Sequence, residues 1–287
     1  YCYRGLGDYD NALKIMDNAE RLLKSDDVKL SKVYVSKGSL YLLSGNYDEA
    51  EKFYKKGFIN AKQTGDTREE IKAVINLAIL DDQNGYVDEA KQKLESALQL
   101  SRSVRNQELE ATALSELAVS YTYSGNLIKA KNYYEESLKI FMVLNHKERL
   151  SNLCANIASL YSQTANYNSA IEYYNNGLDF SGDNVVSKIL NLRGLGDVYS
   201  ILSNYSKSLN YYDEAKRLSQ QIKDIAIETS VDMSIGTLYY NINKPIKALQ
   251  IFIDASKKLD LDNDPYSAED IYFKIGLAYS KIDSLNN

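Results

Sequence analysis

The chain has 287 residues and a formal net charge of −5 at pH 7. This balance leaves no basic field that could hold a phosphate backbone, so we expect this segment not to bind nucleic acid. The apolar fraction of 44% is ordinary for a globular protein, and no apolar run approaches the ~20 residues needed to cross a bilayer, so we expect neither disorder nor membrane contact by this segment.

A six-residue motif, typified by residues 45–50 (Gly-Asn-Tyr-Asp-Glu-Ala), recurs along the whole chain. Successive copies are 38, 40, 40, 40, 38 and 40 residues apart, measured between their last residues, which are Ala12, Ala50, Ala90, Ala130, Ala170, Ser208 and Ala248. Repeats this regular predict a solenoid in which each unit packs on its neighbours. Because the composition does not shift along the chain, we predict a single domain covering residues 1–287.

The first repeat is incomplete in this chain. Residues 1–6 are all that precede its motif, which is too short a stretch for a full helix. We therefore expect a truncated first helix, and we expect the segment to be a fragment of a longer protein.

Residues 66–105 serve as the type repeat. Apolar residues recur at three- and four-residue steps, which predicts a helix over residues 67–82 with Asp66 or Thr67 as its N-cap. Asn84 and Gly85 are expected to end that helix, and a second helix is expected to begin near Asp88. Each repeat is thus predicted to be two antiparallel helices joined by a short turn.

The last predicted helix covers residues 267–282, within a terminal helix and tail at residues 267–287. No second helix follows it. This helix either caps the solenoid or is itself cut short.

Small residues recur where helices must approach closely. On first helices they lie twelve residues before the end of the next motif, at Gly38, Ala78, Ala118, Ala158, Gly196 and Gly236, and Gly276 follows Gly236 at the same 40-residue spacing. On second helices they lie seven residues after it, at Gly57, Ala97, Ser137, Gly177, Ala215 and Ala255. Large residues are expected to fill the spaces between, at Tyr41, Tyr121, Tyr161, Tyr199, Tyr239 and Tyr279 on first helices and at Tyr54, Tyr134, Tyr174, Tyr212 and Phe252 on second helices.

This pattern, Leu-Gly/Ala-x-x-Tyr followed by Gly-x-Tyr-x-x-Ala, resembles the tetratricopeptide repeat over practically the whole chain. The period of about 40 residues is similar to the long-helix variety of kinesin light chains, polarity adaptors, Rap-type receptors and bacterial sensor or regulator proteins. The resemblance implies an all-α, right-handed solenoid of antiparallel helix pairs, a superhelix of about seven repeats plus a terminal helix. Lys37, Asp81 and Asp232 depart from the pattern, because large apolar or aromatic residues are expected at these positions; for Asp81 we expect exposure at a fraying helix end.

Residues suited to catalysis or metal binding are scarce. The single histidine, His146, is expected to be exposed between repeats, and Cys2 and Cys154 are too far apart in the stack for a disulfide and are expected to be free thiols. No Cys/His cluster has metal-ligand spacing, and no pair of carboxylates is expected in an apolar pocket that would raise a pKa. We predict no catalytic residues, no metal and no cofactor, hence no enzyme activity.

The resemblance places ligand contacts on the first helices, which line the concave groove of the superhelix. We predict a protein or an extended peptide as the partner there. Asn76 and Asn156 match the asparagine that long-helix repeats use to clamp a peptide backbone, whereas the lysine-rich clamp for a C-terminal carboxylate is absent. The predicted groove residues are Asn76, Glu116, Tyr123, Asn152, Asn156, Ser159, Arg193, Asp197, Thr237 and Tyr240.

Three functions remain open from the sequence. The first is a non-enzymatic scaffold for proteins or peptides, as the sensing or interaction region of a larger bacterial signalling or regulatory protein. The second is a Rap-like intracellular peptide receptor that switches an attached DNA-binding or phosphatase-like effector, and the third is an enzyme in its own right. A cytoplasmic location is favoured, and a periplasmic one stays open if the segment belongs to a membrane-tethered sensor.

Overall fold

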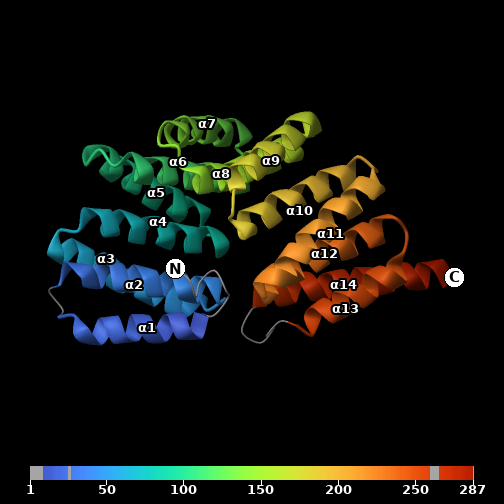
Figure 1. Cartoon of the computed structure of the whole chain (residues 1–287), viewed down its shortest axis with the longest axis horizontal. Coiled ribbons are helices and arrows are strands. Elements are labelled where there is room, and N and C mark those ends of the chain that lie inside the picture. The colour runs from blue at the N-terminus through green and yellow to red at the C-terminus, as the bar shows by residue number, and fades with distance from the viewer. Residues whose placement is uncertain (1–8, 25–26, 259–264, 287) are drawn as a thin grey trace. The chain divides into compact units, whose positions relative to one another are not determined.

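The computed structural model describes residues 9–24, 27–258 and 265–286, and within them every regular element is an α-helix (Figure 1). The helices alternate between first and second members of the repeats, beginning with a second helix. Their bounds are α1 Tyr9–Leu22, α2 Val28–Leu43, α3 Tyr47–Thr64, α4 Thr67–Gln83, α5 Val87–Ser103, α6 Gln107–Tyr123, α7 Leu127–Val143, α8 Lys147–Gln163, α9 Tyr167–Ser181, α10 Val185–Ile201, α11 Tyr205–Ile222, α12 Ile225–Asn241, α13 Pro245–Ser256 and α14 Pro265–Asn286.

The chain divides into two compact units, unit 1 up to Asn156 and unit 2 from Ile157, with the boundary inside the α8 sequence. In unit 1 each helix from α1 to α7 packs against the next, and the first helices also pack on one another, α2 on α4 and α4 on α6. In unit 2 the same holds from α9 to α14, with α10 on α12 and α12 on α14. The predicted helical hairpins are therefore present in both units, and a single domain over residues 1–287 stays a prediction.

The helix boundaries follow the local signals of the sequence. The Asp66 side chain accepts a hydrogen bond from the Glu69 amide and so caps α4, and Asn46, Asn126, Asn166 and Asn204 cap the second helices in the same way. Helix α4 extends to Gln83 and α5 begins at Val87, close to the predicted bounds. The last helix is longer than predicted, Pro265–Asn286. The predicted truncated first helix and Cys2 lie outside the described residues.

The turns need a left-handed backbone whether or not a glycine is present. Gly45, Gly85 and Gly125 adopt positive φ angles of 79°, 83° and 75°. In the later repeats Ala165, Ser203 and Asn243 take the same place, with φ angles of 57°, 58° and 60°. The motif therefore keeps its turn without glycine, because the packed helices on either side hold the strained residue in place.

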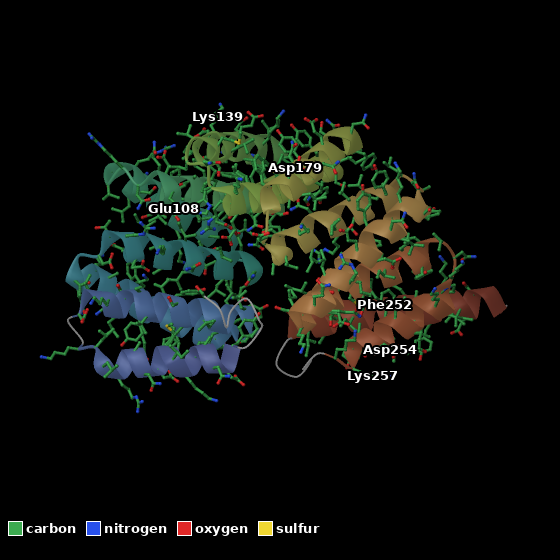
Figure 2. All side chains as sticks on the ribbon, viewed as in Figure 1. Glu108, Lys139, Asp179, Phe252, Asp254 and Lys257 are labelled. Atoms are coloured by element: carbon green, nitrogen blue, oxygen red, sulfur yellow. The ribbon has the colours of Figure 1, made fainter. Side chains whose placement is uncertain are left out.

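The predicted small and large positions form the core. Ala50, Ala90, Ala130 and Ala170 are fully buried, and the large residues of the second helices, Tyr54, Tyr134, Tyr174, Tyr212 and Phe252, are buried against first helices. Phe252 of α13 faces the core, while Asp254 of the same helix and Lys257, which follows the helix, lie at the surface (Figure 2). The alternation is the expected consequence of one apolar stripe per helix.

A second set of aromatic contacts joins the two helices of a hairpin. Ring centroids lie 5.4 Å apart in the stacked pair of Tyr121 and Tyr133, and 5.5 Å apart in the equivalent pairs Tyr161–Tyr173 and Tyr199–Tyr211. Tyr279 was expected to be a core residue as well, but half of its surface is exposed because no described helix follows α14.

The three departures from the repeat pattern are explained by ion pairs. Asp81 was predicted to be exposed at a fraying helix end. It instead pairs with Lys93, at the position where other repeats stack two tyrosines. Asp232 is buried and contacts two lysines, Lys216 at 2.6 Å and Lys258 at 2.8 Å. Lys37 is buried beneath acidic residues of α1. Each charge replaces an apolar contact with a pair that neutralises it.

Candidate functional site: two clefts lined by first helices

Unit 1 contains a cleft of about 510 Å³ whose walls come from the first helices α2, α4, α6 and α8 and from α1. Two positions of the repeat line it in successive helices. One is occupied by Ser36, Asn76 and Glu116, two residues before the small position, and the other by Lys32, Lys72 and Thr112, six residues before it. Apolar residues of α1 and the first helices complete the lining: Ala12, Ile15, Met16, Val35, Leu40, Ile75, Ile79 and Leu109. The cleft thus offers an apolar surface with polar groups at regular intervals, as peptide-binding sites do.

Of the residues predicted for unit 1, Asn76 and Glu116 line this cleft. Asn156 occupies the same repeat position on α8, but neither it nor Asn152 belongs to the lining, and Asn152 is exposed. Tyr123, at the end of α6, is 65% exposed and lies outside the cleft lining. The structure therefore brings together two of the five residues predicted for this part of the chain.

Glu116 differs from the prediction that no pair of carboxylates would lie in a pocket that raises the pKa of one of them. Burial raises the pKa of Glu116 to about 7, with Arg149 opposing the shift and Asp82 adding to it. Burial also raises the pKa of Asp82, which accepts a hydrogen bond from the Ser120 hydroxyl. The prediction failed because Glu116 and Asp82 are 34 positions apart in the chain and become neighbours only when α4 packs on α6.

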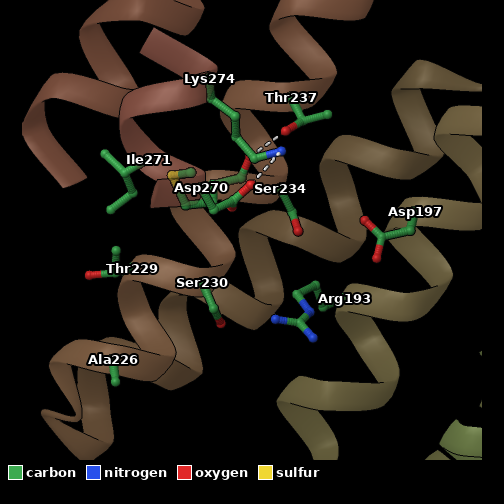
Figure 3. A pocket seen from close by; sticks show the side chains of 11 residues that line it. Arg193, Asp197, Ala226, Thr229, Ser230, Ser234, Thr237, Asp270, Ile271 and Lys274 are labelled. Carbon is green, nitrogen blue, oxygen red and sulfur yellow. Dashed lines mark hydrogen bonds and ion pairs between the residues drawn. The ribbon is translucent and has the colours of Figure 1, made fainter. Parts of the chain in front are cut away.

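Unit 2 contains a smaller cleft of about 330 Å³ between α10, α12 and α14. Figure 3 shows Arg193 and Asp197 of α10, Ser230, Ser234 and Thr237 of α12, and Asp270 and Lys274 of α14 around it. Three of the predicted residues, Arg193, Asp197 and Thr237, therefore line one cleft. Of the other two in this unit, Ser159 is exposed on α8, and Tyr240 lies beneath Lys281, whose Nζ is 4.3 Å from the ring centroid.

Asp197 is held by hydroxyl groups. It accepts a 2.5 Å hydrogen bond from the Tyr212 hydroxyl and another from Ser234. Burial raises the pKa of Asp197, while these hydrogen bonds and Arg193 act in the opposite direction. The Asp197 carboxylate is thus already hydrogen-bonded, and Lys274 of the same cleft is paired with Asp270 at 3.5 Å.

The remaining candidate groups are placed as follows. His146 was predicted to be exposed but is half-buried, and its ring makes a T-shaped contact with that of Phe141. Cys154 is buried and free, and burial raises the pKa of its thiol to about 12. Among the described residues no group of three or more His, Cys, Asp or Glu side chains could hold a metal ion, and no described helix is long and apolar enough to cross a membrane.

The repeat pattern that builds both clefts also matches a known family. The family model described as tetratricopeptide repeat matches residues 31–58, 69–142 and 109–181. Residues 31–58 and 69–181 are therefore tetratricopeptide repeats. Such repeats generally form scaffolds for interaction with proteins or peptides.

Solved structures with tetratricopeptide-like folds resemble the chain at low sequence identity. A Rap protein complexed with competence and sporulation factor has 14% identity and a TM-score of 0.63, over 97% of this chain and 70% of that one. Aspartyl phosphate phosphatase F from Bacillus subtilis has 14% identity and a TM-score of 0.66, over 91% of this chain and 70% of that one.

A third similar structure is the signal transduction ATPase with numerous domains from Pyrococcus horikoshii, which has a tetratricopeptide repeat sensor. It has 18% identity and a TM-score of 0.65, over 96% of this chain, and the chain spans only 43% of that protein. No curated protein sequence matches the chain. At these identities the similarities show the fold alone.

Sequence reasoning missed several cleft residues. Ile15 and Met16 of α1 line the unit 1 cleft although they lie on a second helix, which the repeat register assigns to the outer layer. Lys274 was also missed, although it holds the same repeat position as Asn76 and Glu116 and could have been found by extending that register to the last helix. Arg149 holds the same repeat position as Glu69 and Leu109, so the same extension of the register could have found it.

Proposed function

We propose that the chain is a non-enzymatic scaffold that holds an extended segment of a protein or peptide in the clefts of its first helices. The observation that carries this proposal is the unit 1 cleft, where an apolar floor is combined with an amide, hydroxyls and charges at positions one repeat apart. An asparagine amide both donates and accepts hydrogen bonds, so Asn76 can hold the N–H and C=O groups of a bound backbone whatever its sequence. The generally non-catalytic character of tetratricopeptide repeats supports this role.

Replacing Asn76 by Ala should weaken the binding of a peptide held in the unit 1 cleft by about three- to tenfold, since each lost hydrogen bond contributes ~0.5–1.5 kcal/mol net. The probe is a library of random seven-residue peptides, from which binders are selected with the unaltered protein. Isothermal titration calorimetry then compares the protein with the Asn76→Ala variant.

Two further variants make this measurement specific. Asn132→Ala removes an exposed asparagine of α7, a second helix, and should leave the affinity unchanged. Asn156→Ala reports whether the bound peptide extends beyond the cleft along the same repeat position. If Asn76→Ala binds as tightly as the original protein while its melting curve is unaltered, the peptide does not occupy this cleft.

A receptor that switches an attached effector is the second candidate function. The similarity in fold to a Rap protein complexed with competence and sporulation factor favours it, and the similarity to a tetratricopeptide repeat sensor supports a role in a larger signalling protein. A switching receptor should change its radius of gyration when the selected peptide is added, because binding would favour one arrangement of the helices. Small-angle X-ray scattering with and without peptide tests this; an unchanged radius would favour the rigid scaffold.

A further inference from the structure

The carboxylates of the unit 1 cleft differ in whether they have an ion-pair partner. Among its carboxylates, Glu69 pairs with Lys72 at 2.6 Å and Glu108 pairs with Arg68 at 2.9 Å. Glu116 of α6, which is half-buried, has neither a hydrogen bond nor an ion pair with any residue that the structure describes. An ionised carboxylate in this position has lost much of its hydration without gaining a partner, which is unfavourable unless a cation arrives.

The surroundings of Glu116 add to this imbalance. Asp82 of α4 is close enough to disfavour the charge on Glu116, and one of its oxygens, Oδ1, is buried with no hydrogen bond to the described residues. Tyr123 of α6 and Tyr134 of α7 are close enough for Glu116 to disfavour their ionisation, and burial is the main cause that raises the pKa of each, so both stay neutral near pH 7. The cation that opposes the raised pKa of Glu116 is Arg149 of α8. It is exposed and makes no ion pair with Glu116. Asp82 has Lys91 as its own opposing charge and a hydrogen bond from Ser120, so Arg149 is the one cation among the described residues that acts on Glu116.

We propose that Glu116 is the specificity residue of the unit 1 cleft and that it pairs with a positively charged group of the bound peptide. The group is an ammonium or guanidinium, supplied by a lysine or arginine side chain or by the peptide's amino terminus. This inference rests on the proposed function, because it assumes that a peptide occupies the cleft.

The repeat spacing predicts where the cation lies in the peptide. Asn76 and Glu116 occupy the same position on α4 and α6, which pack directly on each other. Packed helices are ~8–10 Å apart, and an extended chain advances ~3.3 Å per residue. The positive charge should therefore lie about three residues from the backbone group that Asn76 holds.

The raised pKa of Glu116, about 7, gives this pairing a pH dependence. A cationic group favours the ionised carboxylate, so binding should be strongest above pH 7 and should weaken as Glu116 takes up a proton below it. Tyr123 and Tyr134 stay neutral across this window, because burial raises both tyrosine pKa values above a range that is already high. Between pH 8 and pH 6 the affinity should fall about five- to tenfold.

The experiment uses two random seven-residue peptide libraries with amidated carboxyl ends, one with acetylated and one with free amino termini. Each is selected against the full chain and against Glu116→Gln, Glu116→Lys and, as a control, Glu110→Gln. Glu110 lies on the same helix but pairs with Arg102 outside the cleft. Melting curves confirm that the variants are folded.

With the unaltered protein and with Glu110→Gln, we expect lysine and arginine to be enriched at one peptide position in the acetylated library. Enrichment confined to the free-amine library would identify the amino terminus as the cation. Glu116→Gln should lose the enrichment and the pH dependence, and should bind the selected peptides about tenfold more weakly. Glu116→Lys should instead select aspartate and glutamate.

Failure can be assigned to one of the two proposals. If Glu116→Gln and the unaltered protein select the same peptides with the same pH dependence, peptide binding stands and the role of Glu116 is wrong. If neither library yields a binder to the unaltered protein, the proposed function fails and the inference fails with it.

Discussion

Replacing Asp17 by Asn and Glu20 by Gln together should lower the free energy of unfolding by about 3–5 kcal/mol, the usual cost of leaving a buried charge without its partner. Lys37 Nζ lies 2.8 Å from Asp17 Oδ1 and 2.6 Å from Glu20 Oε2, and the lysine side chain is only 5% exposed. Burial tends to lower the pKa of Lys37, but the hydrogen bonds to the two acids outweigh it and raise the pKa, so the lysine is charged. The ring of Phe53, 4.1 Å from Nζ, is the other group that stabilises this charge.

A thermodynamic cycle separates the charge from the packing. Lys37→Met removes the charge and keeps an apolar chain over Phe53, so it should cost less than about 1.5 kcal/mol. When Lys37→Met is combined with the two acid replacements, most of the stability lost in the double variant should return. Urea unfolding at pH 7 measures all three variants; a double variant as stable as the original protein would show that the Lys37 ammonium is well hydrated.

Replacing Gly196 by Leu should destabilise the protein by about 3 kcal/mol, because the added side chain would overlap a buried ring. A Cβ atom at Gly196 would lie 2.4 Å from Tyr212 Cε1 and 2.6 Å from Tyr212 Cδ1. The ring cannot easily retreat, since Tyr212 is 2% exposed and its hydroxyl is bonded to Asp197. The same overlap is present in other repeats, where Gly38 meets Tyr54 and Gly236 meets Phe252.

Gly276 provides the matched control, because it holds the equivalent position on α14 and a Cβ atom there would meet no heavy atom within 4 Å. Gly276→Leu should leave the protein as stable or raise its stability by up to about 1 kcal/mol, since leucine favours the helix more than glycine does. Thermal melts followed by circular dichroism compare the two variants. Equal losses of stability in both would mean that helix propensity or exposure, and not contact with the tyrosine ring, governs this position.

Much of the candidate site could be foreseen from the repeat register, but its chemistry could not. The register places Asn76 and Glu116 on the same face of successive first helices, and both line the unit 1 cleft. It places Asn156 on the same face too, yet Asn156 is not part of that lining. A register specifies which face of a helix a residue occupies, whereas a cleft also depends on how neighbouring helices close around it, as α1 does with Ile15 and Met16.

The sequence by itself determined the helical hairpins, their caps and the alternation of small and large core residues, because these depend on residues within a few turns of one another. Asp66 caps α4 and Ala90 is fully buried for reasons visible in a window of some twenty residues. Only the tertiary structure decided the surroundings and partners of the charged side chains. The pKa of Glu116, the burial of Lys37 beneath α1 and the pairing of Asp81 with Lys93 depend on side chains of other helices. Electrostatic energies sum over every neighbour and change steeply with burial, so they follow from the packed arrangement and not from the local pattern.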